Sequence, residues 1–116
     1  MLWFRKSFIV KHKNDYWVFF DTKETKEGEP WSAGGPYGSF EDADNRQKEV
    51  YMMGHIGAKK YKVGDIIIFL PVPGFGLEGK VLKISDRVKC RILKSNVKKI
   101  SAGDIAWFYP ADVKKK

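Results

Sequence analysis

Apolar and polar residues alternate over several short stretches of this chain, and such alternation is typical of β-strands with one buried face. Residues 2–11 show the pattern moderately and residues 16–20 show it strongly, with an Asn-Asp turn signal between them at positions 14 and 15. Aromatic and β-branched residues dominate the second stretch, which favours a strand further. The two stretches therefore predict an antiparallel hairpin.

A polar segment, residues 21–38, follows the hairpin and is rich in Gly and Pro, which predicts a long loop. Ser39 begins a predicted helix, because Ser39 and Asp42 have the spacing of a capping box and acids favour the first turn. Apolar residues recur at helical spacing within it, namely Phe40, Ala43 and Val50. Gly54 is the expected C-terminal cap, and the helix is expected to cover the hairpin.

The second half of the chain predicts a series of short strands separated by turns rich in Gly and Pro. They are expected at residues 66–70, 80–84, 88–93, 96–100 and 105–109. The run at 66–70 is apolar on both faces, so its outer face needs cover, for which the N-terminal unit is the candidate. In the run at 88–93, Lys89 and Arg91 alternate with apolar residues and should face away from the core. Strands this short and this closely spaced predict a small barrel.

One stretch of this half, from Gly64 to Val81, resembles the KOW motif of transcription elongation factors and certain ribosomal proteins. The positions that match the motif are Gly64, Asp65, Ile67, Phe69, Gly76, Gly79 and Val81. Val72 replaces a usual glycine, and Phe75 stands where a basic residue is common. The resemblance covers about residues 62–93 and implies an SH3-like barrel, a fold that binds RNA, DNA, peptides or other proteins.

The predicted fold is α+β and mainly β, with a small N-terminal ββα unit packed on a C-terminal SH3-like, KOW-type β-barrel. The ββα unit is expected at residues 1–57, the barrel at residues 58–113 and a disordered basic tail at residues 114–116. The segment at residues 35–43 also looks like the loop-to-helix junction of small ββα units in phage and mobile-element proteins. A chain of 116 residues suffices for one domain or for two very small subdomains that share a core.

Charge is distributed unevenly between the two predicted units. Residues 1–57 hold 8 Lys or Arg against 9 Asp or Glu, whereas residues 58–116 hold 14 against 5. The excess that makes the net charge +8 therefore lies entirely in the second half. Such asymmetry indicates a polyanionic partner, either nucleic acid or an acidic membrane surface. No apolar run approaches the roughly 20 residues that span a bilayer, so no membrane partner is expected.

The cations of the second unit are the candidate nucleic-acid-binding residues, because outward Lys and Arg on consecutive strands can follow a phosphate backbone. Phe75, which stands between two glycines in the loop at residues 71–79, is added because its ring can stack on a base or cap the barrel. The set consists of Lys59, Lys60, Lys62, Lys80, Lys83, Arg87, Lys89, Arg91, Lys94, Lys98, Lys99 and Phe75. Lysine on strand faces can equally serve solubility. The reading favours DNA slightly over RNA, with possible action on transcription.

The loop at residues 71–79 supports an alternative function, because Val72 and Leu77 make it unusually apolar. In that alternative the protein docks on transcription or translation machinery through this loop, and the basic face is secondary. Trp31 and Tyr37, in the long polar segment, are further candidates for exposed contacts.

Catalysis finds little support, so the protein is expected not to be an enzyme and to need no cofactor or metal. His12 and His55 are isolated, and no Cys/His spacing suits zinc. The letters Gly-x-Gly-x-x-Gly at residues 74–79 join two predicted strands instead of opening a helix. The loop acids leave a paired-carboxylate nuclease as a third, weak reading, and they are Glu24, Glu27 and Glu29. The single cysteine, Cys90, excludes an internal disulfide and fits a reducing compartment, so a cytoplasmic or nucleoid-associated protein is expected.

Overall fold

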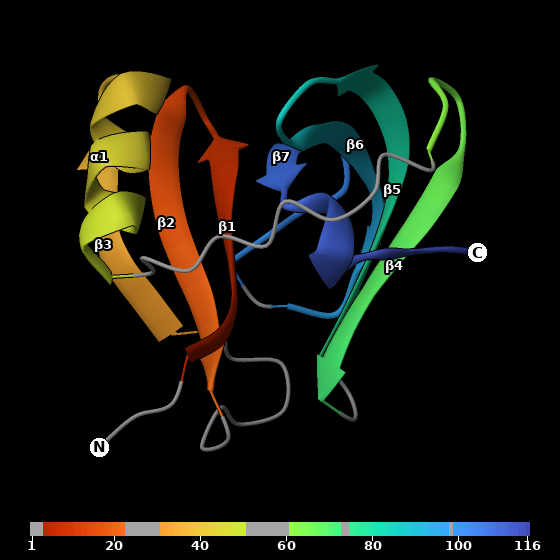
Figure 1. Ribbon diagram of the computed structural model, residues 1–116. Coiled ribbons are helices and arrows are strands. Elements are labelled where there is room, and N and C mark those ends of the chain that lie inside the picture. The colour runs from red at the N-terminus through yellow and green to blue at the C-terminus, as the bar shows by residue number, and fades with distance from the viewer. Residues whose placement is uncertain (1–3, 23–30, 51–60, 73–74, 98) are drawn as a thin grey trace.

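The computed structural model describes residues 4–22, 31–50, 61–72, 75–97 and 99–116. Within them, eight antiparallel strands form one sheet in the order β3-β2-β1-β7-β6-β5-β4-β8 (Figure 1). The elements are β1 Phe4–His12, β2 Asp15–Thr22, β3 Trp31–Tyr37, α1 Phe40–Val50, β4 Ile66–Val72, β5 Phe75–Ile84, β6 Val88–Ser95, β7 Ile105–Phe108, a 3-10 turn Pro110–Asp112 and β8 Lys114–Lys115. The prediction of a mainly β, α+β protein is confirmed at this level.

The predicted N-terminal hairpin is confirmed, and its turn explains its register. Lys13 and Asn14 have φ angles of 52° and 69°, which is the left-handed conformation that a two-residue hairpin turn needs at both central positions. The turn places His12 opposite Asp15 and sets the alternation along both strands. As a result Phe8 and Val10 face one side of the sheet, while Ile9 faces the other.

The predicted loop at residues 21–38 is wrong for its second half, where Trp31–Tyr37 forms the edge strand β3 beside β2. Gly and Pro concealed this strand, but both fit its position. Pro36 needs no donor at a sheet edge, and a side chain at Gly34 would collide with the Tyr37 hydroxyl. Three strands therefore precede the helix instead of two.

Helix α1 begins where the sequence predicts, with the Ser39 Oγ accepting a hydrogen bond from the Asp42 backbone N–H at 3.2 Å. The helix packs across β1, β2 and β3, as Figure 1 shows, so the predicted cover of the hairpin is confirmed. Ala43 and Phe40 pack there with Ile9 and Val18. The expected cap at Gly54 lies outside the described residues.

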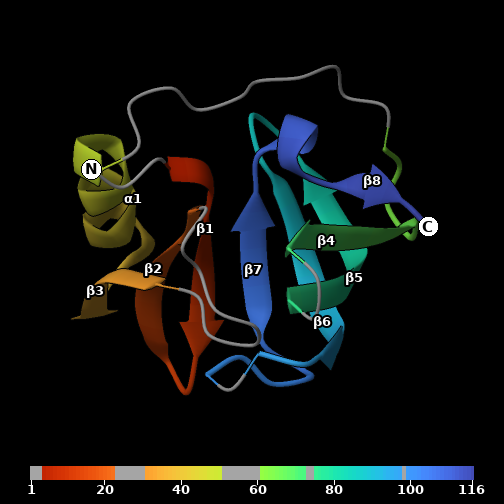
Figure 2. The same ribbon diagram turned by 90° about the horizontal axis from the view of Figure 1, so that it is seen from below.

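The sheet runs without a break through both predicted units, because β7 pairs with β1 on one side and with β6 on the other (Figure 2). On the inner face of the curled sheet, the rings of Phe8, Phe69 and Phe108 lie 4.9 to 5.3 Å apart. Phe69 of β4 thus contacts the N-terminal hairpin across the core. The N-terminal unit was predicted to cover the outer face of residues 66–70. Its helix, α1, packs instead on β1, β2 and β3.

Two predictions about the C-terminal region are wrong. Residues 96–100 are not a strand within the part described: Val97 and Ile100 are buried in a turn. Residues 114–116 are ordered, since β8 pairs with β4 and the Lys116 N–H donates to the Ile66 carbonyl at 2.9 Å. An ion pair also holds the tail in place, because the Lys116 ammonium lies 2.6 Å from the Glu78 carboxylate.

A hydrogen-bonded turn comes before β4 and contains Gly64 and Asp65. Gly64 has a φ of 95°, which favours glycine, and its N–H donates to the Val81 carbonyl at 2.8 Å. The Asp65 carboxylate accepts a hydrogen bond from the Lys62 N–H at 2.8 Å and closes the turn. Among the described residues, no helix is long and apolar enough to cross a membrane.

Candidate nucleic-acid interface

A row of cations crosses the outer face of the sheet, which is the face that also carries α1. The pairing register places Lys11 of β1 opposite Ile105, Ile105 opposite Arg91, and Arg91 opposite Lys80. Residues directly opposite each other on neighbouring strands project to the same side, with Cβ atoms about 5 Å apart. Arg91 and Lys80 are exposed, and Lys11 is half-buried.

A second row lies one step along the strands, where Trp107 stands opposite Lys89 and Lys89 opposite Lys83. The Lys89 ammonium lies 5.7 Å from the centre of the Trp107 ring, in the range of a cation–π contact. Trp107 itself packs on Phe40 of the helix at 4.9 Å. The two rows therefore form one surface on β5, β6 and β7, beside the area that α1 covers. We call it the basic face: Lys11, Lys80, Lys83, Lys89 and Arg91.

The basic face brings like charges together without neutralising them. Two of its cross-strand pairs are cation opposite cation, Lys80 with Arg91 and Lys83 with Lys89. Like charges directly opposite on a sheet are destabilising. Among the described residues, no Asp or Glu lies within ion-pairing distance of these four side chains. An anion on this face would relieve that repulsion.

Arg87 was predicted to be one of the outward cations, and this is wrong. It is 7% exposed, and its guanidinium donates to Gln47 Oε1 at 2.8 Å, to the Tyr109 hydroxyl at 3.2 Å and to the Asp44 carboxylate. The rings of Phe40 and Tyr109 lie 5.2 and 5.1 Å from it. Because Arg87 belongs to the β5–β6 turn, strand alternation does not govern its direction, and it folds onto the helix.

The charges of this buried pair are held in their ionised forms. Burial alone would raise the pKa of Asp44, but hydrogen bonds from Arg87 and Lys48 outweigh burial and lower it. Burial alone would lower the pKa of Arg87, but its hydrogen bonds to Tyr109 and Asp44 outweigh that effect and raise it. Arg87 therefore fastens the helix to the β5–β6 turn and is not available to a ligand.

The other predicted site residues are spread around the basic face. Lys62 and Lys99 are exposed at turns, and Lys94 is exposed but lies 3.8 Å from Glu78. Lys59, Lys60 and Lys98 lie outside the described residues. Phe75 begins β5, and its side chain is also outside the description. Lys11 was missed by the sequence prediction, although its place between Val10 and His12 in an alternating run signals an outward cation.

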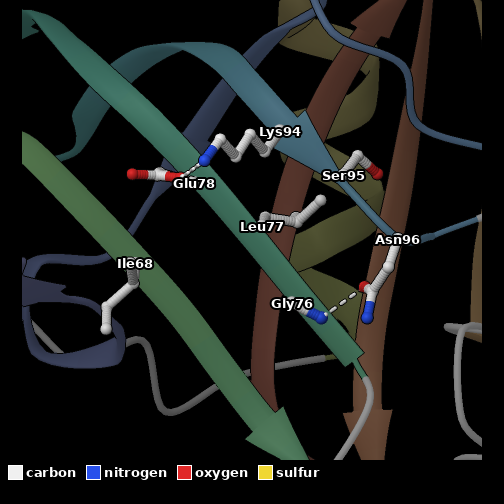
Figure 3. Close-up of a pocket in the computed structure, with 7 residues that line it drawn as sticks. All are labelled: Ile68, Gly76, Leu77, Glu78, Lys94, Ser95 and Asn96. Carbon is white, nitrogen blue, oxygen red and sulfur yellow. Dashed lines mark hydrogen bonds and ion pairs between the residues drawn. The ribbon is translucent and has the colours of Figure 1, made fainter.

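A depression of about 340 Å³ lies at the end of β4, β5 and β6 (Figure 3). It is lined by Ile68, Gly76, Leu77, Glu78, Lys94, Ser95 and Asn96. Glu78 reaches toward Lys94 in the view, and the Gly76 N–H donates to Asn96 Oδ1 at 2.6 Å. A hydrogen bond from Lys116 lowers the pKa of Glu78, so this carboxylate stays ionised at neutral pH. Because Glu78 is anionic, the basic face ends at this depression.

Leu77 does not extend the apolar surface of the predicted loop at residues 71–79. It is 3% exposed and belongs to the inner core. Tyr37, the last residue of β3, packs against the cluster of Ile9, Val18 and Ala43 and does not stand free in a loop. The surface expected for protein docking is therefore smaller than predicted.

Among the described residues, Cys90 is not a reactive thiol and the acids do not form a metal site. Burial raises the pKa of the Cys90 thiol to about 12, so it stays protonated and unreactive. Among the described residues, no group of three or more His, Cys, Asp and Glu side chains is placed to hold a metal ion. Comparison of the chain with protein-family models, with curated proteins and with solved structures finds no significant match.

Proposed function

We propose that this protein binds nucleic acid through the basic face, mainly by contacts to phosphates and with little reading of sequence. The observation that carries the proposal is that two cross-strand pairs of β5 and β6 set cation opposite cation, Lys80 with Arg91 and Lys83 with Lys89. Such an arrangement is unfavourable in the free protein, and a polyanion relieves it while releasing its own counterions. DNA is slightly favoured over RNA, and a role in modulating transcription fits this mode of binding.

We further propose that residues 61–116 form an SH3-like barrel of the KOW type. Supporting this, β4, β5, β6 and β7 follow one another as an antiparallel meander. A one-turn 3-10 helix comes before the last strand, β8, which returns to pair with β4. The hydrogen bonds that join Gly64 and Asp65 to Val81 support it as well. In such a barrel the basic face is the outer surface of the meander.

The test is a salt titration of binding to short duplex DNA, single-stranded DNA and RNA. If each of the five cations on the face neutralises one phosphate, the log–log slope on duplex DNA should be roughly −4.5, at about 0.9 per neutralised phosphate. Arg91→Ala should weaken binding to every sequence and make the slope shallower by about one. The matched control is Arg46→Ala on the exposed side of α1, where the slope should not change. No binding at about 50 mM salt to any of the three polymers would reject the proposal.

The alternative function is docking on transcription or translation machinery through the loop at residues 71–79. The depression at the end of β4, β5 and β6 gives it a site, because Ile68 lies there half-buried beside that loop. It predicts binding to a protein partner that depends weakly on salt and is insensitive to Arg91→Ala. The salt titration therefore separates the two functions.

A further inference from the structure

A second hollow lies away from the basic face, where the β1–β2 turn approaches the segment between β6 and β7 through the contact of His12 with Asp104. It has a volume of about 260 Å³, and its described lining is His12, Trp17, Phe19 and Lys99. Two of these side chains are aromatic and two are basic. Strand alternation separates this hollow from the basic face, because Lys11 projects outward and the next residue, His12, projects to the other side.

The aromatic part of the hollow is held rigidly by its surroundings. Phe19 is 1% exposed and stacks on Phe8 with ring centres 5.7 Å apart. Trp17 is half-buried against the same core. Gly35 lies close against the six-membered ring of the indole, where a Cβ would come within 2.6 Å of Trp17 Cε3. The rings are therefore preorganised as an apolar wall.

The polar part of the hollow is oriented by one carboxylate. His12 Nδ1 lies 2.8 and 3.0 Å from the two oxygens of Asp104, and Asp104 also accepts the Ser101 N–H at 2.8 Å. These bonds occupy Nδ1 and fix the plane of the imidazole, which leaves Nε2 as the ring nitrogen open to a ligand. Lys99 is exposed at the rim, and among the described residues it forms no ion pair.

The size and chemistry of the hollow select a class of ligand. A cavity of about 150 Å³ holds a single benzene ring, and drug-sized ligands use about 300 Å³ or more. A hollow of about 260 Å³ therefore has room for one planar, two-ring group. Aromatic rings provide a stacking surface for such a group. Lys99 provides donors for an anion attached to it, and His12 Nε2 donates as well when the ring is protonated, because Asp104 holds the other proton on Nδ1.

We propose that this hollow binds a single nucleotide, with the base against Trp17 and the phosphate held by Lys99 and His12. The nucleotide is either free or one unit of a nucleic-acid chain, and only the second case rests on the function proposed for the basic face. The hollow and the basic face lie on opposite sides of β1. Their two ligands can therefore be measured separately.

The test is calorimetric titration of the full chain with adenosine monophosphate, with adenosine and inorganic phosphate as separate arms. Adenosine monophosphate should bind about tenfold more tightly than either part alone, because only it uses both the wall and the cations. Lys99→Glu should weaken this binding about tenfold or more. The matched variant Lys114→Glu, exposed on β8 and outside both the hollow and the basic face, should leave it unchanged within about twofold. Both positions are exposed, so both variants should fold.

A single-stranded oligonucleotide then identifies the source of the nucleotide. If it displaces adenosine monophosphate, the hollow takes a unit of a chain, and if it binds without displacement, the hollow takes the free nucleotide. Equal affinity for adenosine monophosphate and inorganic phosphate, or unchanged affinity in Lys99→Glu, would overturn the proposal. Nucleotide binding without any salt-dependent polymer binding would leave it standing and remove the function proposed for the basic face.

Discussion

Arg87 shows how the direction of one side chain changes the meaning of its charge. Lys89, two residues later, lies on the basic face, whereas Arg87 turns inward to Asp44 and the Tyr109 hydroxyl. The same contacts reach Ser7 of β1, because the Gln47 side chain accepts from Arg87 and donates to the Ser7 hydroxyl at 3.0 Å. One buried cation therefore connects the β5–β6 turn, the helix and the hairpin.

Replacing Arg87 with Met should lower the free energy of unfolding by about 2–3 kcal/mol, since it removes the guanidinium from buried Gln47 and the partly buried Asp44 and leaves them only Tyr109 and Lys48 as donors. Urea unfolding followed by fluorescence measures the change. Lys83→Met, an exposed position on the neighbouring strand, is the control and should change stability by less than about 0.5 kcal/mol. Equal losses in the two variants would contradict the role given to Arg87.

At the scale of the element, the pairing of β5 with β6 depends on a missing side chain. Gly79 is buried, and a Cβ there would lie 3.0 Å from the Cβ of Cys90 and 3.4 Å from the Arg91 carbonyl oxygen. Its φ is not in the left-handed region, so the constraint is space and not backbone conformation. The absence of a side chain at Gly79 thus lets two strands of a curved sheet approach each other.

Gly79→Ala should therefore destabilise the protein by about 1–3 kcal/mol, the usual cost of overpacking a core. Thermal unfolding measures the effect. Gly38→Ala is the matched control, because a Cβ at Gly38 meets nothing within 4 Å. A second change, Cys90→Gly, removes the opposing Cβ, and the double variant should lose less than the sum of the single changes. Simple addition of the two losses would argue against the contact.

The C-terminal strand β8 is the other element with a specific consequence. It pairs with β4 beside Ile67 and Ile68 and covers part of that edge. Removing residues 114–116 should lower the midpoint of urea unfolding and increase self-association, because the edge of β4 is then open. Light scattering at increasing protein concentration measures the second effect. An unchanged midpoint and no self-association would mean that β8 contributes nothing.

The ionic part of this tail contact should depend on pH. Lys116 lowers the pKa of Glu78 in the folded protein. The stabilisation is therefore fully present above the ordinary value of 4.5 and is lost as the pH falls through the lowered value. Lys116→Gln should reduce stability at pH 7 and have little effect at a pH well below the lowered pKa of Glu78, whereas Lys114→Gln should have little effect at either pH. A Lys116→Gln effect independent of pH would show that the ion pair is not its cause.

At the scale of the molecule, the sequence predicted those features that depend only on residues close together in the chain. The hairpin turn, the Ser39 cap and the alternation around Cys90 need only neighbours in sequence. The cap and the alternation are found as predicted, and the turn predicted at Asn14 and Asp15 is found one residue earlier, at Lys13 and Asn14. The strand β3 was missed because Gly and Pro usually mark loops, and only its edge position permits them. The direction of Arg87 was missed because it depends on Asp44, a partner distant in sequence.

The shared sheet also predicts how the molecule unfolds. Because β7 joins β1 to β6, residues 1–57 should not form a stable unit alone, and the full chain should unfold in one transition. Circular dichroism of a fragment covering residues 1–57 and of the full chain checks both statements. A folded fragment, or two separate transitions, would show instead that the two units are stable independently.

The pairing of Lys11 with Ile105 has a kinetic consequence, because it joins residues near the two ends of the chain. Contacts of such long sequence separation slow folding, since the loop must close before they contribute. During synthesis, the hairpin is complete early, but the edge of β1 has no partner until β7 has left the ribosome. For that interval it is exposed to other nascent chains. Folding should therefore be limited by the arrival of four residues, Ile105–Phe108, and not by the formation of either half.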